Sequence, residues 1–126
     1  MKTPVFPENM AKPIAPYSPA VCVDNQLFVS GQIALDPANG NLVVDNGIAV
    51  ETTVVMNNLK AVVEAAGFTM ADVVKCSIFM NSMDHYAAVN EVYGQFFSAP
   101  YPAREAVAVK TLPANVNVEI SCIAVK

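Results

Sequence analysis

The sequence has no tryptophan, a single histidine, and three cysteines (Cys22, Cys76 and Cys122) that are too far apart for metal-ligand spacing. It also has no CxxC pair, no Walker loop and no GxGxxG segment. These absences argue against zinc hydrolysis, Cys–His catalysis and a phosphate-cradling nucleotide site. The one histidine, His85, adjoins Asp84 at the start of an expected helix and is interpreted as a solvated surface imidazole. We therefore expect neither a metal nor a cofactor.

Charge is also scarce, since charged residues make up 14% of the chain against 54% hydrophobic residues. A single subunit with so few charges covers its own surface poorly, so we expect an oligomer. The formal net charge is −4 and the seven lysines and arginines are scattered, which weighs against a nucleic-acid ligand. No apolar leader segment is present, and no apolar run approaches the ~18 residues of a membrane span. Together with the odd cysteine count, this favours a cytoplasmic protein without a membrane partner.

The chain length fits a single domain over residues 1–126. Periodicity and turn residues predict a proline-rich extended arm, five strands and two helices. In order, these are the arm over residues 1 to 18, strands over Ala20 to Val23 and Gln26 to Ile33, a helix from about Gly47 to Ala66 capped by Asp45 or Asn46, a strand over Val73 to Ser82, a helix over about Asp84 to Phe97, and strands over Glu105 to Lys110 and Val116 to Val125. This order predicts an α+β fold with one mixed, mostly antiparallel sheet and both helices on the same face.

The strand over Val116 to Val125 has one apolar face and one mixed face. Its apolar positions are Val118, Ile120, Cys122 and Ala124. The strand over Val73 to Ser82 repeats the pattern, with Val74, Cys76, Ile78 and Met80 on one face. In the second helix, we predict a buried stripe of Tyr86, Val89, Tyr93 and Phe96. The mixed second faces of the strands are typical of surfaces that meet another subunit or a ligand.

The residues that could carry chemistry are few: Arg104, Glu119, Tyr17, Ser30, Gly31 and Asn90. The planar fork of Arg104 suits a carboxylate, and Glu119 could hold a water molecule or move its proton. Gly31 interrupts a strand, which indicates a bulge or a close approach to the backbone. Structural roles stay open, because Arg104 could pair with Glu119 or Glu105 across strands, and Asn90 could cap a neighbouring loop.

Short segments in a fixed order carry a resemblance to a known family along nearly the whole chain. They are Ala15-Pro16-Tyr17-Ser18, Ser30-Gly31-Gln32, Asp36-Pro37 with Gly40, Asn58-Leu59-Lys60-Ala61, Glu64-Ala65-Ala66-Gly67, Val89-Asn90 with Tyr93 and Phe96-Phe97, Pro102-Ala103-Arg104, Leu112-Pro113 and Val118-Glu119-Ile120. By their order and spacing the sequence resembles the Rid family, the reactive intermediate deaminases, also called the YjgF family.

The resemblance implies a chorismate-mutase-like fold and a homotrimer whose sheets line a central barrel, with sites in clefts between subunits. It also implies a cofactor-independent hydrolase of the 2-iminobutanoate/2-iminopropanoate deaminase type. Such an enzyme converts small enamino and imino acids, such as 2-aminoacrylate, to 2-keto acids and ammonia. By position, Arg104 would grip the substrate carboxylate and Glu119 would orient the attacking water. The pocket would be shaped by Tyr17, Ser30, Gly31 and Asn90.

The sequence departs from this pattern after the arginine, where many family members have a small polar residue and then a cysteine. Here Glu105-Ala106 stands in their place, which removes a thiol and bears on substrate preference. Two other functions stay open. The family has also been described as endoribonuclease or translation inhibitor, against which the acidic charge weighs. A trimer could also bind small carboxylates without turnover.

Overall fold

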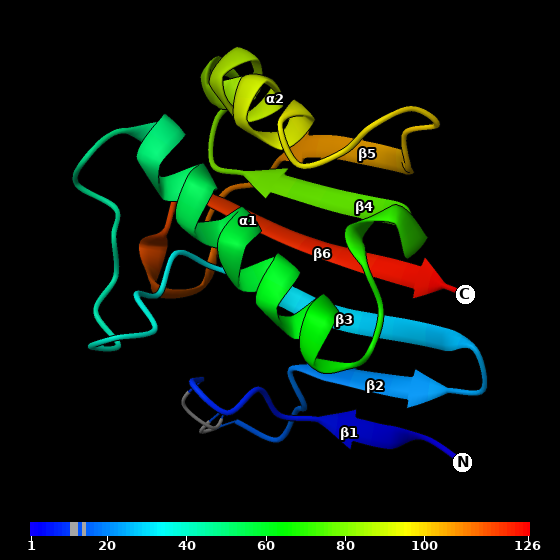
Figure 1. Cartoon of the computed structure of the whole chain (residues 1–126). Coiled ribbons are helices and arrows are strands. Elements are labelled where there is room, and N and C mark those ends of the chain that lie inside the picture. Colours follow the sequence, from blue (N-terminus) through cyan, green and yellow to red (C-terminus); the bar gives the residue numbers. More distant parts are fainter. Residues whose placement is uncertain (11–12, 14) are drawn as a thin grey trace.

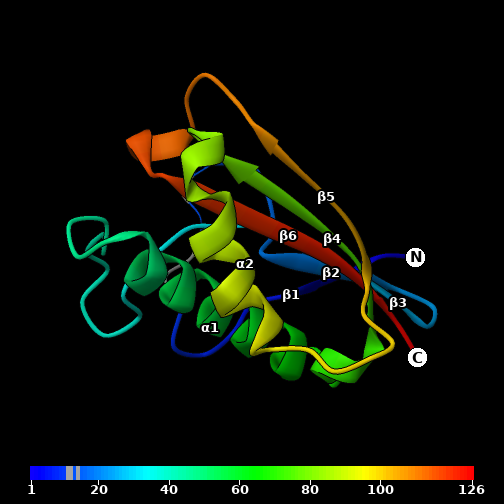
Figure 2. The same cartoon turned by 90° about the horizontal axis from the view of Figure 1, so that it is seen from above.

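The computed structural model describes residues 1–10, 13 and 15–126. These residues form one six-stranded sheet with two α-helices on one face (Figures 1 and 2). The strands follow the order β1-β2-β3-β6-β4-β5, and only the pair β4–β5 is parallel. Their bounds are Thr3–Val5 (β1), Ala20–Val23 (β2), Gln26–Gln32 (β3), Val73–Met80 (β4), Ala103–Ala108 (β5) and Val118–Val125 (β6), and the helices are Ile48–Ala65 (α1) and Tyr86–Gly94 (α2). The predicted α+β class and the shared helix face are confirmed, whereas the trimer and its barrel stay predictions.

The N-terminal arm contains a strand that the sequence did not predict. Thr3–Val5 pairs antiparallel with β2 and forms the edge of the sheet. The arm was predicted as extended over residues 1 to 18, and residues 11, 12 and 14 of it lie outside the described residues. Three residues with a proline among them give little sequence signal, because the pairing partner rather than local propensity makes them a strand.

Helix α1 ends as predicted and begins differently. Gly67 adopts φ +83°, its N–H donates to the Glu64 carbonyl at 3.0 Å, and the Phe68 N–H donates to Val63 at 3.1 Å, which is a Schellman motif. At the start, the N-cap is Gly47, and no side chain caps the helix. The predicted cap by Asp45 or Asn46 is therefore wrong, because both residues precede the turn that Gly47 makes at φ +96°.

The core lies between the helices and the covered face of the sheet. All four predicted apolar positions of β6 are buried: Val118, Ile120, Cys122 and Ala124. In β4, Cys76, Ile78 and Met80 are buried, but Val74 is exposed and Val73 takes its place. The prediction for Val74 is wrong because the β4–β6 register shifts between Val73 and Lys75, which reverses the alternation of faces.

Helix α2 is shorter than predicted and exposes one residue of its predicted stripe. A 3-10 turn, Met83–His85, precedes it, and the α-helix ends at Gly94 rather than near Phe97. Val89 and Tyr93 are buried, but Tyr86 is 40% exposed. Its position at the first turn places it beyond the core and beside β5, where it contacts Arg104. Neither α1 nor α2 is long and apolar enough to cross a membrane, nor is any other helix of the described residues.

Candidate functional site

Four of the six predicted site residues line one cavity. Tyr17, Ser30, Gly31 and Glu119 surround a volume of about 820 Å³ beside β3, the loop that follows it, and the start of β6. The walls also include Pro19, Leu35, Pro37 and Pro113, so apolar surface predominates around the few polar groups. A concave, largely apolar pocket with a small number of convergent polar groups is the usual form of a small-molecule site.

Ser30 ties the N-terminal arm to the sheet at this cavity. Its hydroxyl donates to the Ser18 carbonyl at 2.7 Å, and its backbone N–H donates to the Pro19 carbonyl at 2.9 Å. These bonds hold the chain directly after Tyr17, whose ring stays more than half exposed. Ser30 therefore places Tyr17 at the cavity wall, while its own hydroxyl proton is already engaged.

Gly31 lies in the predicted bulge and makes room for Glu119. The β3–β6 register shifts between Val29 and Gln32, which confirms the bulge at Ser30-Gly31. A Cβ on Gly31 would lie 2.7 Å from Glu119 Cδ, closer than unbonded carbon atoms come. The Glu119 carboxyl is partly buried at this contact, and the loss of hydration raises its pKa above the usual range.

Arg104 belongs to a second group of residues, on β5 and α2. Its Nη2 donates to the Tyr86 hydroxyl at 3.2 Å, and its guanidinium carbon lies 5.6 Å from the Tyr86 ring centre and 5.1 Å from that of Tyr93. Hydrogen bonds from Arg104 and then Asn90 lower the pKa of the Tyr86 phenol. Asn90 Oδ1 is buried without a hydrogen-bond partner among the described residues, so a loop-capping role for this residue is not supported.

These two groups lie on opposite faces of the sheet. Arg104 pairs in register with Cys76, which pairs with Cys122, and both cysteines are buried beneath the helices. Glu119 pairs with Phe79, and each of these residues is three positions from the cysteine on its own strand. Because register partners share a face and faces alternate along a strand, Arg104 points to the covered face and Glu119 to the uncovered one.

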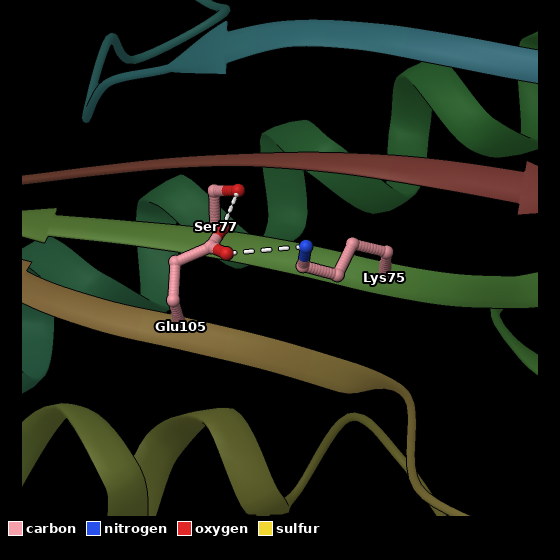
Figure 3. Close-up of polar contacts among 3 residues, drawn as sticks. All are labelled: Lys75, Ser77 and Glu105. Carbon is pink, nitrogen blue, oxygen red and sulfur yellow. Dashed lines mark hydrogen bonds and ion pairs between the residues drawn. The ribbon is translucent and has the colours of Figure 1, made fainter.

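The ion pairs considered for Arg104 within the chain are absent from the described residues. Glu105, its sequence neighbour, instead accepts from Ser77 and pairs with Lys75 Nζ at 3.1 Å on the uncovered face (Figure 3). Ser77 and then Lys75 hold the pKa of the Glu105 carboxyl below its usual range. The guanidinium of Arg104 therefore keeps donors available for a carboxylate from outside the chain.

Sequence reasoning missed three residues that shape these groups. Tyr86 and Tyr93 flank Arg104, but the sequence predicted both as members of a buried helix stripe and assigned neither a role beside Arg104. Glu51 is fully buried on α1 and accepts hydrogen bonds from Asn117, the residue directly before β6. A glutamate between Val50 and Thr52 gives no signal of burial, because its partners lie 66 residues further along the chain.

The fold and the cavity define a small α+β domain with a largely apolar pocket at the bulge of its sheet. A family model described as endoribonuclease L-PSP matches residues 7–126. The chain therefore belongs to this family, which is the Rid or YjgF family, and the resemblance seen in the sequence is confirmed.

Individual relatives carry different names. A crystal structure of a candidate endoribonuclease from Thermotoga maritima is 51% identical, with TM-score 0.95 over 100% of this chain and 98% of that one. A Dermatophagoides farinae protein named 2-iminobutanoate/2-iminopropanoate deaminase is 43% identical, covering 99% of this chain and 94% of its own. Escherichia coli TdcF, solved with bound serine, is 35% identical with TM-score 0.91 over 98% of both chains. Several other relatives are named only as RutC family proteins.

Proposed function

We propose that this protein is a cofactor-independent imine and enamine deaminase that converts 2-aminoacrylate-type intermediates to 2-keto acids and ammonia. The observation that carries the proposal is the pair of complementary groups just described. Arg104 keeps free donors for a carboxylate, and Glu119 is a half-buried carboxyl in a cavity that could hold an attacking water. The deaminase names of two relatives, from Dermatophagoides farinae and Capra hircus, support the same reaction.

The reaction requires little activation of the substrate by the protein, because an imine carbon is already electrophilic. Arg104 would bind the substrate carboxylate through two parallel hydrogen bonds and fix the position of the C=N bond. Glu119 would accept a proton from water as the water oxygen bonds to that carbon. The same proton would then pass to the nitrogen to give a carbinolamine. As the C–N bond breaks, the hydroxyl proton of the carbinolamine would move through Glu119 to the nitrogen, which leaves as ammonia, and the C=O bond of the keto acid forms. Water is consumed and nothing is oxidised, so no redox group is required.

We further propose that the complete site forms between two subunits of a homotrimer. A single chain places Arg104 and Glu119 on opposite faces of its sheet, so a small substrate could not reach both within one subunit. A neighbouring copy seated on the uncovered face would bring its own side chains to the Glu119 cavity. Phe28, Val74 and Val107 are exposed apolar residues that such a contact would cover.

Keto-acid release from freshly generated 2-aminoacrylate tests the activity directly. A dehydratase supplies the intermediate in situ, and 2-keto acid formation is corrected for spontaneous hydrolysis. The proposal expects acceleration by the parent protein and a loss of at least about 100-fold in kcat/KM for Arg104→Ala, since charge-assisted hydrogen bonds contribute ~1.5–3 kcal/mol each. Arg104→Lys keeps the charge without the fork and should fall between the two.

The same preparation discriminates the other candidate functions. Saturable binding of small carboxylates without any turnover would contradict the deaminase and support a binding protein. Salt-sensitive RNA binding, with cleavage lost on Glu119→Ala, would instead support the endoribonuclease description of the family. The net charge of −4 gives such binding no electrostatic basis.

A further inference from the structure

Glu51 is the one acidic side chain buried completely among the described residues. It lies in the first turn of α1 with 0% of its surface exposed. Its Oε2 accepts from the backbone N–H of Asn117 at 2.8 Å and of Val118 at 3.3 Å. Its Oε1 accepts from the Asn117 amide at 2.7 Å. A carboxylate buried this deeply needs such partners, and the donors belong to Asn117, directly before β6, and to Val118, its first residue.

The segment that Glu51 holds follows a strained turn. Immediately before it, Ala114 and Asn115 adopt φ values of +57° and +55°. The left-handed region is unfavourable for alanine, so this turn persists only because its neighbours hold it. On the other side, Asn81 at the end of β4 donates to the Asn117 side chain at 2.9 Å and to its carbonyl at 3.1 Å. Asn117 is thus fixed between α1 and β4.

We propose that Glu51 is a positioning residue for Glu119, acting through the start of β6. Glu119 is two residues beyond Asn117 and directly follows Val118, and Glu51 holds the backbone N–H groups of both Asn117 and Val118. A displacement of this short segment therefore moves Glu119 with it. The contact with Gly31 leaves the Glu119 carboxyl no free space on one side. A small shift of the strand therefore changes where the carboxyl lies relative to a bound substrate.

This inference rests on the proposed function, in which Glu119 orients the water. The same geometry predicts which kinetic constant changes. Arg104 lies on β5 and is supported by α2, and none of the three Glu51 bonds reaches those elements. Loss of Glu51 should therefore disturb the water-activating group and leave the carboxylate clamp intact, so that kcat falls while KM stays nearly constant.

The first test is Glu51→Gln, which keeps the side-chain shape but turns one acceptor oxygen into a donor. We expect kcat to fall about tenfold, within the loss that a small misplacement of a reacting group causes, with KM changed by less than about twofold. Glu64→Gln, an exposed change on the same helix, is the matched control and should match the parent. If Glu51→Gln does not fold, Asn117→Ala replaces it, because it removes one donor and keeps the buried charge and both backbone donors.

A double-mutant cycle separates positioning from general damage to the fold. If Glu51 acts only through Glu119, adding Glu51→Gln to Glu119→Gln should leave the residual rate unchanged within about twofold. A purely structural role predicts the opposite, since the two losses would then multiply. Multiplied losses, or an unchanged kcat in folded Glu51→Gln, overturn the inference.

A readout that needs no turnover keeps this inference distinct from the proposed function. Carbon-13 NMR of labelled glutamate carboxyls follows the titration of Glu119, whose cavity also has Asp36 and Tyr17 as titratable groups in its wall. Glu51→Gln should lower the Glu119 midpoint towards that of an exposed glutamate, because a loosened β6 admits water. An unchanged midpoint overturns the positioning role. A parent protein without imine hydrolysis overturns the proposed function, and the NMR titration then decides the role of Glu51 alone.

Discussion

The Glu119 carboxyl group lies directly against the backbone of Gly31. A Cβ built on Gly31 would be 2.7 Å from Glu119 Cδ and 2.8 Å from Oε2. Real side chains do not approach so closely, so the absence of a side chain at residue 31 sets the position of the carboxyl group. The bulge in β3 and the proposed water-orienting group are therefore one structural unit.

Gly31→Ala should move Glu119 and reduce activity more than stability. The backbone of Gly31 does not require a left-handed conformation, so an alanine can be accommodated by displacing the flexible glutamate. We expect kcat to fall about tenfold or more, because the displaced carboxyl no longer faces the substrate. Steady-state imine hydrolysis measures this. Gly94→Ala is the control, since nothing lies within 4 Å of the added Cβ there, and it should keep parent activity. Equal rates for parent and Gly31→Ala would contradict the arrangement.

The raised pKa of Glu119 has a consequence for stability. Its folded-state pKa lies above the unfolded one, so the folded protein binds this proton more tightly, and stability is lost as the pH rises through the folded pKa. Glu119→Gln carries no charge at any pH. It should therefore unfold at a higher temperature than the parent at pH ~7, with the difference shrinking below pH ~4, where the carboxyl is protonated in both states. Thermal unfolding at several pH values measures this, and a less stable variant at pH ~7 would count against it.

Activity should follow the same ionisation in the opposite sense. Only the ionised Glu119 can accept a proton from water, so kcat/KM should rise with pH and reach half its plateau above the ~4.3 of an ordinary glutamate. The pH profile of imine hydrolysis, corrected for the uncatalysed rate, measures the midpoint. Asp36→Asn removes the other carboxyl of the cavity wall and should leave the midpoint in place. If the midpoint instead shifts in Asp36→Asn, then Asp36 rather than Glu119 is the proton acceptor.

Tyr86→Phe isolates the hydroxyl that supports Arg104. The ring and its contact with the guanidinium remain, but the 3.2 Å hydrogen bond is lost. The guanidinium then samples more orientations before it binds a carboxylate, so we expect KM to rise about twofold to fivefold with little change in kcat. Tyr101→Phe, a change at a tyrosine 64% exposed, is the control. An unaltered KM in Tyr86→Phe would show that the ring alone supports Arg104.

The spacing of apolar residues and the residues typical of turns predicted most of the fold. The alternation of Val118, Ile120, Cys122 and Ala124 identified both faces of β6, and Gly67 identified the end of α1. These features succeed because they depend on residues close in sequence. Val74 failed because a register shift depends on the partner strand, and β1 was missed because three residues become a strand only through their pairing with β2.

The candidate site was also predictable only in part, and again the local features were the predictable ones. The sequence suggested Arg104 and Glu119 individually, and it suggested the Gly31 bulge, but not that the two side chains lie on opposite faces. That relationship depends on the register of β4 against both β5 and β6, which join segments far apart in the chain. Glu51 was missed for the same physical reason, since its burial is explained only by donors at Asn117 and Val118, far along the chain.

In the proposed trimer, Arg104 of one subunit and Glu119 of another complete each site. Arg104→Ala and Glu119→Ala should each be nearly inactive, and each should retain the parent's oligomeric state, about three times the 13.4 kDa chain mass. When the two are unfolded together and refolded at equal ratio, sites that pair an intact Arg104 with an intact Glu119 should reappear. Random assembly restores about one quarter of the sites, so about one quarter of the parent rate should return.

The rate of imine hydrolysis by the mixed subunits measures this pairing directly. Each variant refolded alone is the control and should stay inactive. Recovery of about one quarter of the parent activity is the predicted result. A mixture no more active than its components, with mixed oligomers demonstrated by mass spectrometry, would contradict a site shared between subunits. It would place Arg104 and Glu119 in one subunit's site or exclude one of them from it.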